Sequence, residues 1–149
     1  MNRKKILPPT YFNSAIALII IIYFIFPISE IIYFPWNLLG LLSALTGVIL
    51  NLHTDNLFKK YATTVQPFEE SSNLITNGMF RLSRNPMYLG MSLILLGMSI
   101  FLGSIGPFFV ILIFVILMDQ IFIRVEELML EKKFGDKWLK YKNSVRRWI

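Results

Sequence analysis

TNGMFRLSRNPMYLG, residues 76–90, is the stretch around which the chain is organised. It is a polar, basic segment that ends at Pro86 and continues directly into an apolar run. Proline is favoured in the first turn of a helix, because the amide hydrogen that it lacks would have no partner there. A plain membrane anchor does not need two glycines, a proline and two arginines at its start. The stretch therefore predicts a binding site at a membrane surface.

Outward from this stretch, the composition is typical of a membrane protein. Hydrophobic residues make up 55% of the 149 residues, the mean hydropathy is +0.59, and the apolar residues fall in long runs that suit a bilayer. The chain has no cysteine and one histidine. These counts exclude disulfides, cysteine nucleophiles and multi-histidine metal cages, so we expect no metal. The length suits a single domain, residues 1–149.

Four apolar runs predict an all-α integral membrane protein with about four transmembrane helices, a cytoplasmic loop and amphipathic helices after the last span. The second run carries small residues on one side, which predicts close helix packing. Gly135 should cap the first amphipathic helix, and the stretch from Trp138 onward should lie in the membrane interface. The predicted spans are 12–34, 36–52, 87–104 and 108–123, and the small residues are Gly40, Ser43, Ala44 and Gly47.

Charge is distributed unevenly around these spans. The net charge is +6, and every lysine and arginine falls in the N-terminal segment, the loop 53–86 or the segment after the fourth span, all of which share one side. The opposite turns contain Glu30 and no basic residue. The positive-inside rule then places both ends of the chain in the cytoplasm, as expected for a bacterial inner-membrane protein. Because the basic residues flank spans, we expect lipid rather than nucleic acid as their partner.

Two polar clusters should meet on the basic side. One is 84–88 and the other is 124–127, and the antiparallel pairing of the last two spans brings them within a helix packing distance of ~8–10 Å. Arg84 could hold a carboxylate and Glu126 an ammonium group, with the ring of Tyr88 beside them. The set is compatible with an amino-acid-like zwitterion that carries an aromatic ring.

Each of these residues also has a plainer interpretation. Arg84 could be an ordinary basic flank of a span, and Glu126 and Glu127 could lie on a solvated helix face paired with nearby lysines or arginines. Asp119 lies inside the fourth predicted span. Carboxylates at such positions serve a function or form a buried pair, and Gln120 is the candidate partner.

The chain resembles the isoprenylcysteine carboxyl methyltransferase family, which is related to the membrane phospholipid methyltransferases. The resemblance covers the chain from His53 onward, and it rests on two motifs in the right order rather than on one. The first spans are similar to the family only as hydrophobic helices. The matching segments are LITNGMFR at 74–81, RNPMYLG at 84–90, EEL at 126–128, FG at 134–135, Trp138, Tyr141 and VRRWI at 145–149.

The resemblance implies an integral membrane enzyme that uses S-adenosyl-L-methionine and methylates a carboxyl, amine or thiol of a lipophilic or small acceptor. The cofactor would lie at the cytoplasmic end of the last two spans, within 66–90 and 119–149, and a lipophilic acceptor would enter from the bilayer. The implied cofactor contacts are Gln66, Leu74, Ile75, Phe80, Arg84, Asn85, Pro86, Met87, Tyr88 and Glu126.

Two positions depart from the family pattern. Asn85 stands where the family often has histidine, and asparagine does not titrate. Phe122 stands where an arginine of the eukaryotic branch holds the substrate carboxylate, and the nearest arginine is Arg124. Alignment and desolvation supply most of the catalysis of methyl transfer, but an amine or hydroxyl acceptor would need a base, for which Asp119 or Glu127 is the candidate. The alternative is a non-catalytic membrane protein that retains the fold.

Overall fold

The computed structural model describes residues 7–25, 30–63 and 71–149. Helices account for all of its regular secondary structure in these ranges, apart from one isolated bridge between Glu30 and Ser104. The all-α prediction is therefore confirmed for the described chain. In chain order the elements are α1 (Pro8–Ile25), η1 (Trp36–Leu38), α2 (Leu39–Lys60), η2 (Gly78–Arg81), α3 (Pro86–Leu102), α4 (Gly106–Leu117), η3 (Met118–Ile123), α5 (Arg124–Phe134) and α6 (Asp136–Ser144).

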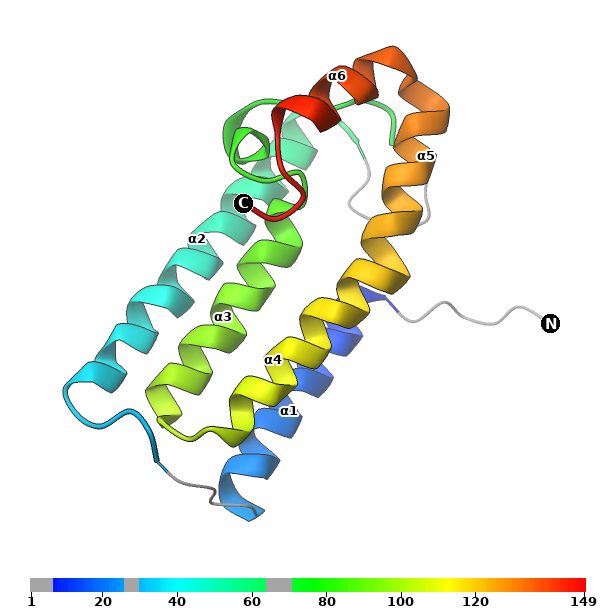
Figure 1. The fold of residues 1–149 in the computed structure, drawn as a ribbon. Coiled ribbons are helices and arrows are strands. Elements are labelled where there is room, and N and C mark those ends of the chain that lie inside the picture. The colour runs from blue at the N-terminus through cyan, green and yellow to red at the C-terminus, as the bar shows by residue number, and fades with distance from the viewer. Residues whose placement is uncertain (1–6, 26–29, 64–70) are drawn as a thin grey trace.

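Four apolar helices, α1 to α4, run side by side as a bundle (Figure 1). The most extensive packing pairs α2 with α3 and α1 with α4. Three helical stretches are long and apolar enough to cross a membrane, namely Pro8–Ile25, Trp36–Lys60 and Gly106–Phe134. The fourth, α3, has 17 residues, or about 26 Å at 1.5 Å per residue against a hydrocarbon core of about 30 Å.

The close contact between α2 and α3 depends on glycines, which have no side chain. A Cβ atom on Gly40 would collide with the carbonyl oxygen of Gly97, and one on Gly47 would collide with that of Gly90. The hydroxyl of Ser43 also donates to the Leu93 carbonyl oxygen at 2.9 Å. In lipid, small residues permit this close backbone approach and the dispersion contacts that come with it. The packing role predicted for the small face is confirmed.

The end of the first predicted span is wrong. α1 ends at Ile25, residues 26–29 with Pro27 lie outside the described chain, and the backbone from Glu30 to Pro35 is not helical. The amides of Ile31 and Ile32 donate instead to the Gly103 carbonyl oxygen, at 2.8 and 3.2 Å. Gly103 ends α3 with φ +71, a left-handed conformation that glycine adopts without steric cost.

The second predicted span ends at residue 52, and α2 continues beyond it as helix to Lys60. Its last two turns leave the apolar part of the bundle, where an ion pair between Asp55 and Lys59 at 2.6 Å joins successive turns. Leu57 and Phe58 on these turns pack against the residues that close this end of the bundle. The helix therefore serves both as a span and as a support for the loop above it.

A cap formed by residues 71–81 and α6 closes the end of the bundle (Figure 1). Gly135, with φ +51, separates α5 from α6 as predicted. Trp138 and Tyr141 of α6 are buried against Ile75 and Phe80. These two side chains thus pack on the protein's own loop rather than on lipid, and the position of the stretch in the membrane interface stays a prediction.

Candidate functional site

A cavity of about 590 Å³ lies beneath the cap, at the end of the bundle that carries the basic residues. Its walls come from the start of α1, the cap, the start of α3 and the first turns of α5. The volume is within the range of about 300–1,000 Å³ that is typical of small-molecule sites.

The cavity gathers the residues that the sequence predicts as cofactor contacts. Those in the described chain all line it: Leu74, Ile75, Phe80, Arg84, Asn85, Pro86, Met87, Tyr88 and Glu126. Gln66 lies outside the described residues. Because these residues come from segments up to 52 positions apart (126 − 74), their meeting at one cavity is not a consequence of their being neighbours in sequence. Their contact with a cofactor stays a prediction.

Tyr88 and Glu126 join the two polar clusters. The Tyr88 hydroxyl donates to Glu126 Oε1 at 2.6 Å, so the predicted meeting of the clusters is confirmed. Pro86 begins α3, which puts Tyr88 in its first turn, and Glu126 is in the first turn of α5. The ring of Tyr88 stacks on Phe122, with the centroids 6.3 Å apart. Phe122 therefore supports the aromatic wall of the site from behind.

Arg84 and Trp138 both line the cavity, and each also carries one buried donor that has no hydrogen-bond partner among the described residues. Arg84 Nη1 donates to the Lys142 carbonyl oxygen at 2.8 Å, and Nη2 donates to Glu127 Oε1 at 2.9 Å. Arg84 Nε and Trp138 Nε1 are both buried without a hydrogen-bond partner among the described residues. The side chain of Arg84 is 8% exposed. Orphaned buried donors are rare in native structures and call for a ligand or a water.

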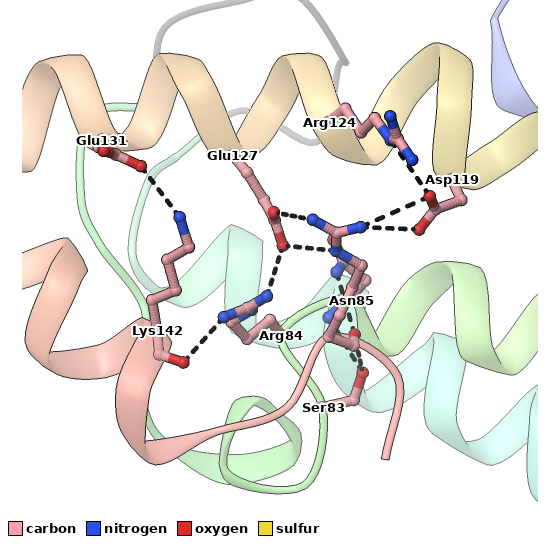
Figure 2. Close-up of polar contacts among 9 residues, drawn as sticks. Ser83, Arg84, Asn85, Asp119, Arg124, Glu127, Glu131 and Lys142 are labelled. Atoms are coloured by element: carbon pink, nitrogen blue, oxygen red, sulfur yellow. Dashed lines mark hydrogen bonds and ion pairs between the residues drawn. The ribbon is translucent and has the colours of Figure 1, made fainter.

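Asp119, Arg124 and Glu127 do not line the cavity. They belong to an ion network behind it, which Figure 2 shows on the side of the long helix that faces Ser83, Arg84 and Asn85. Glu127, whose side chain is 7% exposed, contacts Arg84 at 2.9 Å and Arg147 at 2.6 Å. The interpretation of Glu127 as a solvated residue is therefore wrong.

Asp119 pairs with arginines rather than with Gln120. Its carboxylate lies 3.2 Å from Arg147 Nη1 and 3.4 Å from Arg124 Nε. Asp119 was expected either to serve a function or to form a buried pair, and in the structure it forms an ion pair. Its partner Arg147 was not predicted from the sequence. The hydrogen bond to Glu127 is the main reason that the pKa of Arg147 is raised above its ordinary value, although burial acts in the opposite direction.

Asn85 occupies the position where the family often has histidine, and here its side chain holds the segment after α6. Its Nδ2 donates to the Arg147 carbonyl oxygen at 3.1 Å, as does Ser83 Oγ at 3.1 Å. The backbone amide of Arg84 donates to the Arg146 carbonyl oxygen at 3.0 Å. No local pattern marks Arg147 for this role. The sequence signal that could have indicated it is the pair of carboxylates Asp119 and Glu127 on one continuous helix, because buried carboxylates need cations from elsewhere in the chain.

The model of the phospholipid methyltransferase family matches residues 36–137, which include both Tyr88 and Glu126. The chain belongs to the phospholipid methyltransferase family. An uncharacterized protein of Haemophilus influenzae (strain ATCC 51907 / DSM 11121 / KW20 / Rd) is 43% identical to it over 63 residues, which make up 42% of this chain and 100% of that protein.

The structure of this phospholipid methyltransferase family member is similar to a solved structure of the eukaryotic intramembrane Ras methyltransferase ICMT (isoprenylcysteine carboxyl methyltransferase), determined without a monobody. The TM-score is 0.69 at 24% identity, and the match covers 100% of this chain and 53% of that one. The chain thus spans about half the length of that protein, and likeness at this identity shows the fold. Together, the family and the fold confirm the resemblance and support a membrane methyltransferase.

Proposed function

We propose that this chain is an S-adenosyl-L-methionine-dependent methyltransferase of the bacterial inner membrane that methylates a lipophilic acceptor at the cytoplasmic face. One observation carries the proposal. Every described residue that the sequence predicts as a cofactor contact lines a single cavity, and that cavity lies at the basic end of an apolar bundle. The membership in the phospholipid methyltransferase family agrees with it.

The chemistry of the cavity wall fits the cofactor. Leu74, Ile75 and Phe80 offer an apolar surface for an adenine ring. The Glu126 carboxylate, oriented by Tyr88, suits the ammonium group or the ribose hydroxyls. Arg84 also lines the cavity, and its guanidinium gives that part of the wall a positive charge that suits a carboxylate.

S-adenosyl-L-methionine supplies an electrophilic methyl group when it is bound. The protein's part is then to hold the acceptor in line with that group and to exclude water, which together lower the barrier without covalent help. Glu126 is the carboxylate that lines the cavity, whereas Asp119 and Glu127 are engaged by arginines. This geometry favours a supporting role for those two residues over the role of base.

The acceptor would reach the cavity from the bilayer. Leu7, Pro8 and Met91 form an apolar part of the wall where α1 and α3 enter it. Phe122 lies behind the cavity wall at the position where the eukaryotic branch has a substrate-binding arginine, and it carries no charge. The cations that line the cavity are Arg84, Lys132 and Lys133 among the described residues. We rank a phospholipid amine first among the carboxyl, amine and thiol acceptors, in agreement with the family.

The alternative, a non-catalytic protein that retains the fold, draws on Asn85 and Phe122, the two departures from the family pattern. The two proposals differ in whether the cavity binds the cofactor product. Calorimetric titration of the purified protein in nanodiscs with S-adenosylhomocysteine separates them. We expect binding by the wild type and strong loss of affinity in Glu126→Gln.

Glu131→Gln is the matched control, because Glu131 is on the same helix but pairs with Lys142 outside the cavity wall. It should bind like the wild type. Absence of binding by folded wild-type protein would favour the non-catalytic alternative. If the wild type binds, transfer of a radiolabelled methyl group from S-adenosyl-L-methionine into fractionated lipid extracts identifies the acceptor.

A further inference from the structure

The Arg147 side chain bridges two carboxylates on the long helix. Its Nε and Nη2 donate to Glu127 Oε1 and Oε2 at 3.1 and 2.6 Å, and its Nη1 donates to Asp119 Oδ1 at 3.2 Å. A bidentate guanidinium fixes both the distance and the orientation of a carboxylate. Arg147 therefore determines where Glu127 lies on α5.

The helix is adapted to this bridge. In an α-helix the eight residues from Asp119 to Glu127 advance roughly 80° beyond two full turns, which would place the two carboxylates on different faces. The intervening η3 is a π-helical segment, and its wider turn, closed by i→i+5 hydrogen bonds, rotates less per residue. Both carboxylates consequently project from one side of the helix, as Figure 2 shows.

The backbone of residues 146–147 is bound to the start of α3. The Arg147 carbonyl oxygen accepts hydrogen bonds from Ser83 and Asn85, and the Arg146 carbonyl oxygen accepts one from the amide of Arg84. Residues 146–147 thus connect α5 to the segment that begins α3. Asn85 and Glu126, which are next to these connections, both line the cavity.

We propose that Arg147 is a positioning residue of the methyl-transfer site, which aligns the Glu126 wall with the Asn85–Tyr88 wall by joining Glu127 to the start of α3. The proposal rests on the proposed function for the identity of the ligand. It does not require Arg147 to touch the cofactor, and Arg147 does not line the cavity.

The remaining ion pairs distinguish positioning from plain stabilisation. Without Arg147, Glu127 retains its contact with Arg84 at 2.9 Å, and Asp119 retains its contact with Arg124 at 3.4 Å. No buried carboxylate would be left without a cation, so the helices should remain folded. The loss is confined to the side-chain link from α5 to residue 147, while the direct Arg84–Glu127 pair remains. A ligand that spans both walls would sense the loss of this second link.

The test compares Arg147→Gln with Arg124→Gln, a matched control that also removes an Asp119 partner. Arg124 is 55% exposed, and among the described residues no hydrogen bond links it to the start of α3. We expect Arg147→Gln to weaken S-adenosylhomocysteine binding by about tenfold, as is usual for coupled neighbours, and Arg124→Gln to leave it unchanged. Hydrogen exchange of the backbone at 83–90 in the ligand-free protein should become faster in Arg147→Gln only.

Two further variants keep the test decisive. Arg147→Lys preserves the charge but not the bidentate geometry, so it should fold and show an intermediate affinity. Ser83→Ala removes one bond to the Arg147 carbonyl oxygen and should act in the same direction. Wild-type affinity and exchange in Arg147→Gln, or an equal effect of Arg124→Gln, would overturn the proposal. If wild-type protein fails to bind the ligand, the proposed function fails, and the exchange measurement still decides whether Arg147 holds the two walls together.

Discussion

Tyr88→Phe removes one oxygen atom from the cavity wall and leaves the aromatic ring in place. The hydroxyl donates to Glu126 at 2.6 Å, and within the described residues the carboxylate has no second hydrogen bond. A hydrogen bond to a charged group contributes about 1.5–3 kcal/mol. If this free energy serves to orient Glu126 toward the ligand, its loss raises the dissociation constant of S-adenosylhomocysteine by about 10- to 150-fold, at 1.4 kcal/mol per factor of ten.

The assay is calorimetric titration of the purified variant in nanodiscs, with circular dichroism to confirm the helical content. Tyr141→Phe is a control of the same size, since Tyr141 also lines the cavity but donates to the Phe80 carbonyl oxygen at 2.7 Å instead of to Glu126. It should lower stability more than affinity. An unchanged dissociation constant in folded Tyr88→Phe protein would refute the reasoning that the Tyr88–Glu126 pair faces the ligand.

Two other predictions concern stability. Gly97→Val should lower the melting temperature in detergent by several degrees, because its Cβ would collide with Gly40 and Ala44 of α2 and overpacking costs about 1–3 kcal/mol; an unchanged melting temperature would contradict the close approach of the helices. Burial raises the pKa of the Tyr141 phenol, against the opposing effect of Arg84. The unfolded chain then loses this proton first, so stability should fall as pH rises above about 10. A pH series of denaturant titrations should show a larger loss of stability in the wild type than in Tyr141→Phe.

The sequence predicts best what local rules determine. Pro86 at the start of α3, Gly103 near its end and Gly135 after α5 follow from backbone conformation alone. The apolar runs predict the helices, but hydropathy does not distinguish an apolar loop from a helix, so the prediction of helix from Glu30 to Phe34 is wrong. The hydrogen bonds from Ile31 and Ile32 to Gly103 depend on a turn about 70 residues away.

The location of the site could also be predicted, because the resemblance and the pairing of the last two spans point to the same cavity. The roles of individual charged residues could not. Glu126 and Glu127 are adjacent and chemically alike, and on a helix they project about 100° apart, so that one lines the cavity and the other is buried in the ion network. Which of the two faces inward depends on Arg147 and on the π-helical turn. Arg147 lies in the family-like segment VRRWI at 145–149, but the resemblance assigns it no role, and no pattern in the sequence indicates the π-helical turn.

The continuous helix formed by α4, η3 and α5 also determines how deep in the membrane the site lies. Helix continues without a break over the 20 residue-to-residue steps from Gly106 to Glu126 (126 − 106), a length of about 30 Å at 1.5 Å per step. This length matches the thickness of the hydrocarbon core. If Gly106 marks one boundary of the oil layer, Glu126 lies at the other. Reactive groups would therefore be met where headgroups and water begin, while the tails of a lipid acceptor stay dissolved in the bilayer below.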